Sequence, residues 1–317
     1  MTRAIVTGAR GFVGTYLVDL LLREGMTVMG VDRADAGPRE EPSGQVEFRA
    51  LDLEQGAELL GEVLAGAPVD FVFHLAAVSH IPTAWQDPGR VYRANVLGTL
   101  NVLEAVRTRS PSTRVLFVGS GTEYGVVPRD QQPIRETWPL SPIDPYATSK
   151  MIGEQLCSAY VRMHGLQVVM ARAFNHTGPR QSPQFVCSAL AKQIAELGRV
   201  PSSTEVSVGD LEAIRDFTDV RDVVSAYLLL ARAGDAGEVY NVCSGKGWHI
   251  RDILQVLRHL AGREDLKAIA RKETDRGEPL PSLVGDNAKI RLALGWTPRI
   301  TLEQSLADLL DYWRASS

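Results

Sequence analysis

The sequence predicts an α/β fold with a doubly wound parallel sheet, followed by a smaller C-terminal α/β domain. A short apolar run at residues 3–7 leads through a glycine-rich turn into an amphipathic helix. Strand-like and helical stretches then alternate as far as residue 172, which is the pattern of successive βαβ units. Residues 69–77 are almost all apolar, as expected for a parallel strand that is buried on both faces. Together these observations predict a Rossmann-type sheet.

The composition is that of a globular protein and excludes several classes of function. The chain has 317 residues, 44% of them hydrophobic and 23% charged, with a net charge of −4. This length allows one or two domains with a large core. Because the charge is slightly negative and basic residues form no block, we expect no nucleic-acid partner. No apolar run approaches the roughly 18 residues of a membrane-spanning helix, so we expect no membrane partner either.

The N-terminus and the cysteines indicate the compartment. The chain passes from Met1 directly into the first predicted strand, so no signal peptide is expected. The three cysteines, Cys157, Cys187 and Cys243, are far apart and odd in number. We interpret them as buried free thiols rather than as a disulfide framework or a metal site. The sequence therefore predicts a cytoplasmic protein without a metal centre.

The glycine-rich turn predicts a dinucleotide site. Gly8, Gly11 and Gly14 follow the first strand with the spacing G-x-x-G-x-x-G. Gly8 permits the tight turn, Gly11 lets the backbone approach a pyrophosphate, and Gly14 lets the helix pack against the strand. The phosphates would bind the free N–H groups at the start of the helix, which includes Phe12 and Val13. An ordinary βα turn is the alternative interpretation.

Acidic residues after the next strands are candidates for binding the adenosine half of the dinucleotide. Asp32 ends the strand at 27–32, where a carboxylate would bind the ribose hydroxyls, which favours NAD. Arg33 follows directly and would suit the 2′-phosphate of NADP, so the choice between NAD(H) and NADP(H) stays open. Asp52 and Leu53 follow the strand at 46–50. Asp52 would either meet the adenine amino group or cap a helix.

The carboxyl end of the 69–77 strand predicts a second contact with the cofactor. Leu75, Ala76 and Ala77 are small or apolar and would let the backbone lie against a dinucleotide. Ser79 begins the following loop, on the side of the sheet where ligands of open α/β folds bind. His74, inside the strand, is expected to be a packed and hydrogen-bonded histidine.

Tyr146 and Lys150 are the candidate catalytic pair. Pro145 can start a helix, predicted to run to Met163, and a four-residue spacing places the phenol and the ammonium on one face of it. A phenol normally has a pKa of about 10, and a neighbouring cation favours the phenolate. The pair therefore suits proton transfer to or from a sugar oxygen. Ser120, at the end of the strand 114–120, would hydrogen-bond the reacting oxygen beside it. A solvated lysine near a helix start is the ordinary alternative.

The remaining elements complete the predicted organisation. Asn95 lies within a long helix predicted at 88–108. Its side chain would hold a water molecule or a backbone kink beside the candidate catalytic lysine, or else it would simply face solvent. We expect a nucleotide domain at 1–172 and 216–244 and a substrate domain at 173–215 and 245–317. Further strands are expected at 166–172, 205–208 and 238–242, and further helices at 186–197, 214–232, 249–261 and 302–315.

The ordered motifs together resemble the extended short-chain dehydrogenase/reductases, a family of nucleotide-sugar epimerases, dehydratases and reductases. The resemblance covers nearly the whole chain. It is carried by Gly8, Gly11, Gly14, Asp32, the 74–77 strand end, Ser120, Tyr146 and Lys150. The motifs at 174–179, 215–220, 240–245 and 295–298 look most like those of the GDP-4-dehydro-6-deoxy-mannose reductases.

One position separates the reductases from the dehydratases of this family. Sugar 4,6-dehydratases carry a glutamate two residues after the catalytic hydroxyl residue, where it helps to eliminate water. This chain has Thr122 at that position. Glu123 is adjacent but would point the other way in an extended segment. The departure argues for simple reduction of a ketone.

The resemblance implies that hydride from NAD(P)H reduces the C4 ketone of a GDP-sugar while Tyr146 donates the proton. It also implies that Lys150 lowers the tyrosine pKa and hydrogen-bonds the nicotinamide ribose, so that Tyr146 and Lys150 are cofactor contacts as well. It further implies that Asn175, Arg215 and Arg276 bind the sugar and its diphosphate. Each of the three has an ordinary alternative. Asn175 would cap a turn, Arg215 would form an ion pair with Asp216 or Asp219, and Arg276 would be a solvated surface charge. The complete set of candidate substrate contacts is Ser79, Ser120, Thr122, Glu123, Tyr146, Asn175, Arg215 and Arg276.

Two alternative functions and one partner follow from the same residues. A 4,6-dehydratase or 4-epimerase would use the same scaffold and keep its cofactor bound. A non-catalytic dinucleotide sensor would have no need for the trio of Ser120, Tyr146 and Lys150. The helices at 88–108 and 145–163 resemble the pair that forms a four-helix bundle in homodimers of this family. The nucleotide base and the stereochemistry at C4 are left open.

Overall fold

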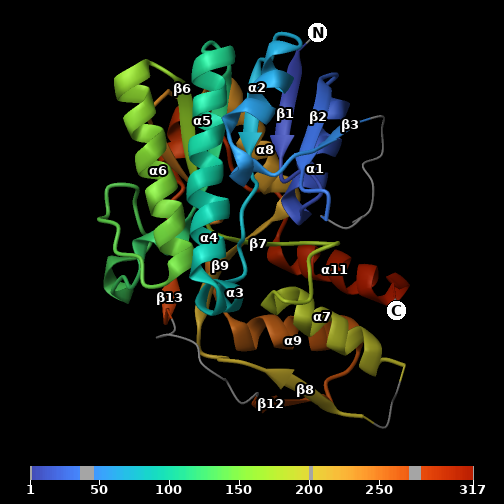
Figure 1. Ribbon diagram of the computed structural model, residues 1–317. Helices are drawn as coiled ribbons and strands as arrows, with labels where there is room; N and C mark the ends of the chain where they lie inside the picture. The colour runs from blue at the N-terminus through green and yellow to red at the C-terminus, as the bar shows by residue number, and fades with distance from the viewer. Residues whose placement is uncertain (1, 36–45, 200–202, 271–279, 317) are drawn as a thin grey trace.

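A seven-stranded parallel sheet forms the centre of the molecule. The computed structural model describes residues 2–35, 46–199, 203–270 and 280–316 (Figure 1). The strand order is β10-β6-β5-β4-β1-β2-β3, and every neighbouring pair is parallel. The strands are β1 (Arg3–Thr7), β2 (Thr27–Asp32), β3 (Glu47–Ala50), β4 (Phe71–His74), β5 (Arg114–Ser120), β6 (Gln167–Ala173) and β10 (Val239–Val242). The predicted doubly wound sheet is confirmed.

The order of the strands reverses between β1 and β4, which places a crevice at the carboxyl ends of these two strands. Ligands of open α/β sheets bind at such a switch point. Gly8 follows β1 and the residues from Leu75 follow β4. The sheet therefore brings both predicted cofactor segments to one place.

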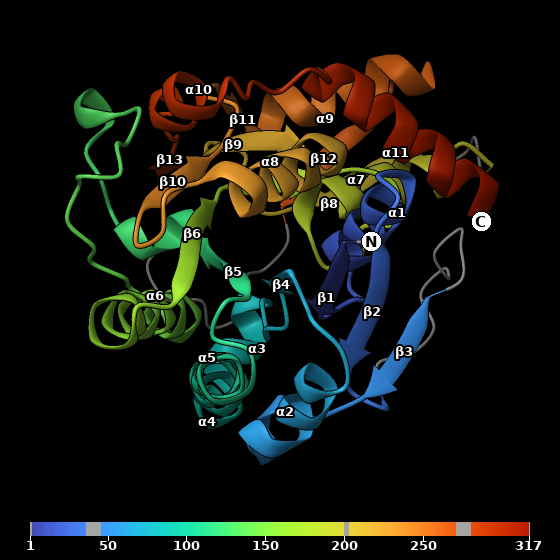
Figure 2. The ribbon, with the colours of Figure 1, turned by 90° about the horizontal axis from the view of Figure 1, so that it is seen from above.

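Helices cover both faces of the sheet (Figure 2). One face packs against α1 (Phe12–Arg23), α8 (Val220–Ala233) and α10 (Ala288–Leu294). The other packs against α2 (Ala57–Ala65), α5 (Gly98–Arg109) and α6 (Pro145–His164). Each face has its own cluster of buried apolar side chains, which explains why the strands are apolar on both sides.

The catalytic helix α6 starts and ends where its sequence dictates. The Asp144 carboxylate accepts a 2.8 Å hydrogen bond from the N–H of Ala147, and Pro145 occupies the first turn. Gly165 ends the helix in the left-handed conformation, with φ = 67°. These caps fix the first turn, and with it Tyr146, at the carboxyl end of β5.

The helix predicted at 88–108 is present but is not uniform. It consists of α4 (Pro88–Tyr92), a π-helical turn at Arg93–Leu97, and α5. The turn contains Asn95, whose side chain forms hydrogen bonds with Val78, in the loop after β4, and with Ser149 of α6. A short helix, α3 (Ile81–Gln86), precedes this run.

The second part of the chain forms a separate apolar core from α7 (Val186–Leu197), α9 (Ile250–Ala261) and α11 (Leu302–Ser316), below the sheet in Figure 1. Its strands are β7 (Asn175–Thr177), β8 (Glu205–Val208), β9 (Ile214–Asp219), β11 (Gly247–His249), β12 (Lys267–Ala270) and β13 (Ser282–Leu283). β7, β11 and β13 all pair with β9, and β8 pairs with β12. The two-domain division expected from the sequence stays a prediction, which this separate core supports.

The prediction of one helix over 214–232 is wrong at its start. Residues 214–219 form β9, and the helix α8 begins at Val220. The Asp219 carboxylate caps α8 by accepting a 2.8 Å bond from the N–H of Arg221. The sequence pattern of the helix therefore begins at the capping residue Asp219. The residues before it form a strand because they pair with β7, β11 and β13.

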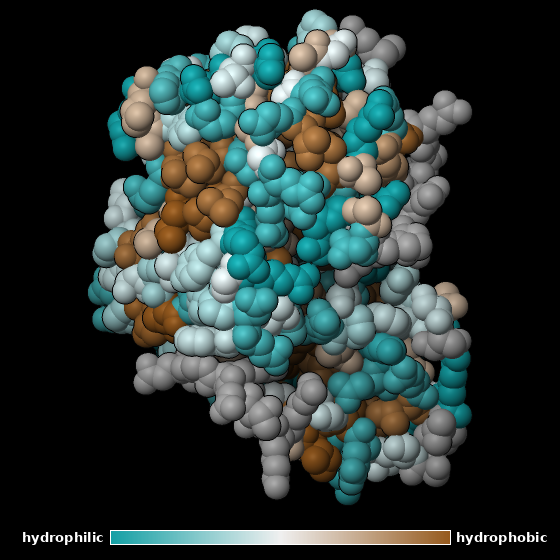
Figure 3. Space-filling view, in the orientation of Figure 1, coloured by the Kyte–Doolittle hydropathy of each residue, from teal (hydrophilic) through white to brown (hydrophobic). Residues whose placement is uncertain are grey.

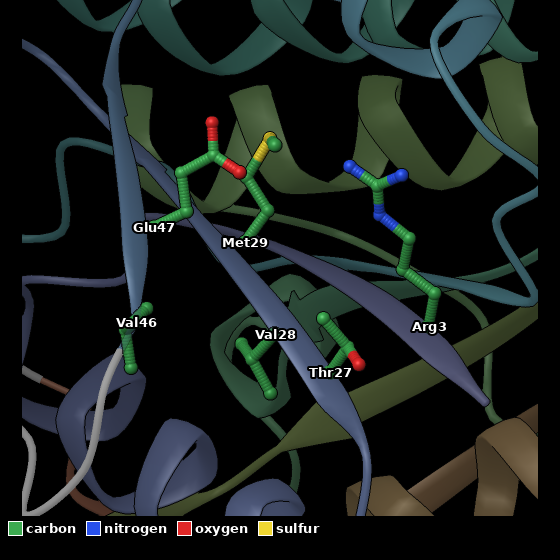
Figure 4. A pocket seen from close by; sticks show the side chains of 6 residues that line it. All are labelled: Arg3, Thr27, Val28, Met29, Val46 and Glu47. Atoms are coloured by element: carbon green, nitrogen blue, oxygen red, sulfur yellow. The ribbon is translucent and has the colours of Figure 1, made fainter. Parts of the chain in front are cut away.

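Two further observations concern the molecule as a whole. A hollow lined by Arg3, Thr27, Met29 and Glu47 lies at the amino ends of β1, β2 and β3 (Figure 4). Gly8 and Ser120 lie at the carboxyl ends of their strands, at the other end of the sheet, so this hollow is not the predicted cofactor site. Among the described residues, none of the helices combines the length and the apolar character that crossing a membrane requires.

Candidate active site

The turn after β1 has the shape that a pyrophosphate requires. Gly8 has φ = 70°, and a Cβ there would lie 2.9 Å from the backbone nitrogen of Ala76. A Cβ on Gly14 would lie 2.2 Å from the carbonyl oxygen of Gly8, so only glycine lets α1 pack against the turn. Gly11 stands at the N-cap of α1, which has no side-chain cap. The first N–H groups of α1 are thus not used by a capping side chain, and they fit a dinucleotide phosphate.

Asp32 lies beside this turn at the end of β2. Its carboxylate accepts 2.9 Å hydrogen bonds from the backbone N–H groups of Arg10 and Arg33. These bonds hold the carboxylate at the edge where an adenosine ribose would lie. The Arg33 side chain is 39% exposed and forms an ion pair of 3.3 Å with Asp35. Asp32, which would favour NAD, and Arg33, which would favour NADP, therefore both lie at the carboxyl end of β2.

Asp52 caps the short turn Leu53–Gln55 by accepting a 3.0 Å bond from the N–H of Glu54. The capping alternative is thereby confirmed, and contact with adenine stays a prediction. Leu53 is buried, and its carbonyl oxygen accepts a bond from the side chain of Asn101.

The carboxyl end of β4 lies against the glycine turn, as expected. Leu75 and Ala76 are the backbone neighbours that a Cβ on Gly8 would strike. Ser79 is exposed in the loop that follows. His74 is buried, and its ring contacts the hydroxyl oxygens of Thr7 at 2.8 Å and Thr99 at 3.0 Å.

Burial, and secondarily the charge of Lys150, lowers the pKa of His74 to about 3. The ring is therefore neutral at physiological pH. The prediction of a packed and hydrogen-bonded histidine is confirmed.

The structure brings Ser120, Tyr146 and Lys150 together. Ser120 ends β5, and its side chain is within hydrogen-bonding reach of the Tyr146 phenol. Lys150 lies one turn further along α6 and donates a 2.7 Å bond to the carbonyl oxygen of Val118 in β5. The Oγ of Ser120 also lies 2.8 Å from the hydroxyl of Thr122. The hydroxyl, phenol and amine thus meet at the carboxyl end of one strand.

The pKa of Tyr146 differs from the sequence prediction. Burial raises it above its ordinary value, while the hydrogen bond from Ser120 opposes the rise and the charges of Glu123 and Asp144 add to it. The expected lowering by Lys150 is wrong for this geometry, because desolvation of the phenol dominates. Tyr146 is therefore a neutral phenol at physiological pH and is ready to donate its proton.

Lys150 is also desolvated. Burial lowers its pKa from the usual 10.5 to about 8, against the opposing attraction of Glu123. The amine is still mostly protonated at neutral pH, but it loses its proton at a lower pH than an exposed lysine does.

Asn95 connects the catalytic helix to the loop after β4. It is 2% exposed, and its amide nitrogen donates to the Oγ of Ser149 at 2.8 Å and to the carbonyl of Val78 at 3.1 Å. Its amide oxygen accepts from the N–H of Val78 at 2.8 Å. The solvent-facing alternative is wrong, and the predicted kink is the π-helical turn. Asn95 fixes Ser149, which lies between the two candidate catalytic residues of α6, Tyr146 and Lys150.

The residues after Ser120 form a 3₁₀ turn, Gly121–Tyr124, and not an extended segment. Thr122 is half-buried next to the Ser120 hydroxyl. Glu123 has no exposed surface, and its Oε1 accepts a 2.6 Å bond from the N–H of Ser120. The prediction that Glu123 contacts the substrate is wrong, because its carboxyl is enclosed behind the catalytic strand. The side chain beside the Ser120 hydroxyl is thus a threonine and not a carboxylate.

Two predicted substrate ligands lie in the described part of the second region, and one does not. Asn175 begins β7 and is half-buried. Arg215 lies in β9, is half-buried, and donates a 2.8 Å bond to the carbonyl of Ile214. Arg276 falls outside the described residues.

The proposed ion pairing of Arg215 does not occur. Asp216 accepts bonds from Ser244, Gly245 and Gly285, and Asp219 pairs with Arg221. Within the described ranges no carboxylate is within 4 Å of the Arg215 guanidinium, and burial lowers its pKa. Such a group is suited to binding an anion.

Comparison with known proteins identifies the family. The family model described as "GDP-mannose 4,6 dehydratase" matches residues 5–309. The chain belongs to this family. The predicted resemblance to the extended short-chain dehydrogenase/reductases is thereby confirmed.

The similar proteins of this family and its relatives include enzymes of different chemistry. The chain is 39% identical to the GDP-6-deoxy-D-mannose reductase of Pseudomonas aeruginosa, over 99% of this chain and 97% of that protein. It is 31% identical to a UDP-glucose 4-epimerase of Mycolicibacterium smegmatis, over 99% of each. The chain is also similar to the solved structure of RMD from Pseudomonas aeruginosa complexed with NADPH. The similarity extends over 100% of this chain and 100% of that one, with a TM-score of 0.85 and 36% identity.

In this member of the GDP-mannose 4,6-dehydratase family, the sequence interpretation missed a second buried polar cluster. Arg172 binds Glu154 with two bonds of 2.7 and 2.8 Å and donates a 2.8 Å bond to the Tyr124 hydroxyl, which donates to Asn241. Two signals pointed to it. Arg172 follows the apolar run Val168–Ala171 of one strand, and Glu154 lies one turn after Lys150 on the same helix face.

Proposed function

We propose that this protein is an NAD(P)H-dependent oxidoreductase that reduces the C4 ketone of GDP-4-dehydro-6-deoxy-D-mannose to GDP-D-rhamnose. The observation that carries the proposal is the site around Ser120, where Tyr146 is a neutral proton donor and Thr122 takes the place of a carboxylate. Ketone reduction needs one proton donor and no base to remove water. The 39% identity to a GDP-6-deoxy-D-mannose reductase over nearly the whole chain supports the same choice.

The chain's residues divide the reaction between them. The Gly8 turn and the start of α1 would hold a nicotinamide cofactor, which would supply the hydride for C4. Ser120 donates a hydrogen bond to the ketone oxygen and stabilises the charge that develops there. Tyr146 transfers its phenolic proton to the same oxygen, which yields the alcohol, and regains a proton from solvent. The hydrogen bond from Ser120 favours the phenolate that remains, until the phenol is reprotonated.

Substrate binding falls to the second region. The unpaired guanidinium of Arg215 suits the diphosphate, with which it can form two parallel hydrogen bonds. Asn175, on the neighbouring strand β7, would bind the sugar or its first phosphate. Arg276, Ser79 and Thr122 remain further candidates for substrate contacts.

A 4,6-dehydratase or 4-epimerase is the second candidate, because both activities occur among similar proteins. The experiment that decides is incubation with GDP-4-dehydro-6-deoxy-D-mannose and either NADH or NADPH. The proposal predicts stoichiometric loss of the nicotinamide absorbance and a new alcohol at C4, whose configuration NMR identifies. Tightly bound NAD with turnover of GDP-mannose or a UDP-sugar, and no consumption of added reductant, would contradict it.

We also propose that the protein is a cytoplasmic homodimer joined through α5 and α6. Apolar side chains gather between these helices on the surface (Figure 3). Leu97, just before α5, is 44% exposed, and Met163, near the end of α6, is 70% exposed. Three buried free cysteines support a reducing compartment.

Sedimentation velocity tests the dimer. Leu97→Glu should give a monomer, whereas Leu292→Glu, at a position on α10 that is 78% exposed, should not. A wild-type monomer, or a dimer that survives Leu97→Glu, would rule out this interface.

A further inference from the structure

Glu123 lies directly behind the catalytic serine, although the reaction as proposed gives it no role. Its Oε1 accepts a 2.6 Å bond from the N–H of Ser120, and the two residues form a reciprocal capping box around the 3₁₀ turn. A Cβ on Gly119 would lie 2.6 Å from the same oxygen, so the strand makes room for the carboxyl at this point. The carboxyl therefore fixes the backbone from which the Ser120 hydroxyl projects.

The second oxygen of this carboxyl has no partner. Oε2 of Glu123 is buried and has no hydrogen-bond partner in the described part of the chain. An unsatisfied buried carboxyl oxygen costs free energy, so its presence needs an explanation.

Charged groups from two neighbouring elements face Glu123. Helix α6 contributes Lys150 and Glu154, and strand β6 contributes Arg172. The Arg172 charge is already compensated by its two bonds to Glu154. Of the two described cations that act on Glu123, Lys150 is then the one that forms no ion pair with a described carboxylate. The same carboxyl also acts on the Tyr146 phenol and the Cys157 thiol of α6.

Taking the proposed reductase function as the basis, we propose that Glu123 is a positioning residue of the active site. It holds Ser120 in place through the backbone, and its negative charge, when present, keeps Lys150 protonated to higher pH. Burial, and next repulsion from Glu154, raises the pKa of the Glu123 carboxyl to about 8, so that it ionises in the range where Lys150 loses its proton. An ionised Glu123 favours the ammonium form of Lys150 and so extends activity toward alkaline pH.

Two substitutions at this position separate the two parts of the proposal. Glu123→Gln keeps an oxygen that can accept from the N–H of Ser120 but cannot ionise. Glu123→Leu has a similar volume and removes both properties. Glu62→Gln, on the exposed surface of α2, is the matched control for loss of one carboxylate.

The first measurement is the pH profile of kcat and KM with the GDP-keto sugar. In Glu123→Gln we expect the alkaline limb of kcat to move about one pH unit lower, because Lys150 loses an attracting charge. In Glu123→Leu we expect kcat to fall about tenfold or more with little change in KM, since loss of a cap displaces Ser120. The glutamine variant should restore most of that loss at acid pH. Coincident profiles for wild type and Glu123→Gln would overturn the proposal.

The second measurement does not need substrate. Infrared difference spectra of the protein between about pH 7 and 10 should show a buried carboxylic acid band that disappears near pH 8, above the range in which Asp216, whose pKa burial raises to about 6, ionises. This band should be absent from Glu123→Gln and present in the Glu62→Gln control. A wild-type spectrum without it overturns the inference. A wild-type protein that shows the band but reduces no keto sugar at any pH contradicts the proposed function instead.

Discussion

Two buried polar clusters share helix α6, and they are built in opposite ways. In one, Arg172 has two bonds to Glu154 and one to Tyr124, so its charge is balanced by a partner. In the other, Lys150 donates to the carbonyl of Val118 and no carboxylate is within ion-pair distance among the described residues. Lys150 and Glu154 are only one helical turn apart.

The difference shows in the pKa values of the two cations. Burial lowers the pKa of Lys150 to about 8. Burial also acts to lower the pKa of Arg172, but the bonds to Glu154 outweigh it and the pKa is raised. A paired buried charge stays fixed and holds elements together, whereas an unpaired one can change its protonation state. We therefore propose that the cluster around Lys150 serves catalysis and that the Arg172–Glu154 cluster stabilises the fold.

The largest expected effect is on activity, from Tyr146→Phe. The substitution removes only the hydroxyl that donates the proton, so kcat should fall by about 10²–10⁴-fold. The melting temperature should change little, because the ring remains. Steady-state NADPH oxidation and calorimetry measure the two quantities. Tyr160→Phe, on the same helix α6, removes a hydroxyl that donates to Glu104 of α5; it is the control and should keep its kcat. A Tyr146→Phe variant with more than about a tenth of the wild-type kcat would remove Tyr146 from the mechanism.

The next effect is on stability, from Arg172→Met. The variant leaves Glu154 buried without its cation, which should lower the free energy of unfolding by about 3–5 kcal/mol. Urea denaturation measures this loss. Replacing Glu154 by methionine as well should recover most of it, since no unpaired charge then remains. A loss below about 1 kcal/mol in the single variant would show that the pair is not structural.

A third prediction compares two glycines with the same backbone conformation. Gly8 has φ = 70° and Gly25 has φ = 74°, but a Cβ would meet Ala76 at Gly8 and nothing within 4 Å at Gly25. Both alanine variants should lose about 1 kcal/mol of stability from strain at positive φ, and Gly8→Ala should lose more because its Cβ also meets the backbone of Ala76. Only Gly8→Ala should also raise the Kd for NADPH, by about tenfold or more, because the cofactor turn must shift. Calorimetric titration checks this, and equal affinities in the two variants would contradict the predicted cofactor site.

The sequence predicted the nucleotide-binding half better than the rest. Its strands are regular and apolar on both faces, so the glycine turn and the Tyr146–Lys150 pair could be placed from local patterns alone. The strand β9 was missed because it is held by pairing with β7, β11 and β13, which is a long-range effect. The burial of Glu123 and the raised pKa of Tyr146 also depend on how helix, strand and turn pack, and no local pattern records that.

The measurement that tests the account most directly is the stability of Lys150→Met against pH. The folded-state pKa of Lys150, about 8, is below its ordinary 10.5, so below pH 8 the folded protein bears the full penalty of a desolvated ammonium. This penalty diminishes as the pH rises toward 10.5, since the folded state has already released the proton. Lys150→Met should therefore be inactive yet more stable than wild type at pH 7, by about 1–2 kcal/mol after loss of the bond to Val118, and the advantage should shrink toward pH 10. A variant that is instead destabilised at pH 7 to the same degree as Arg172→Met would contradict the division between the two clusters.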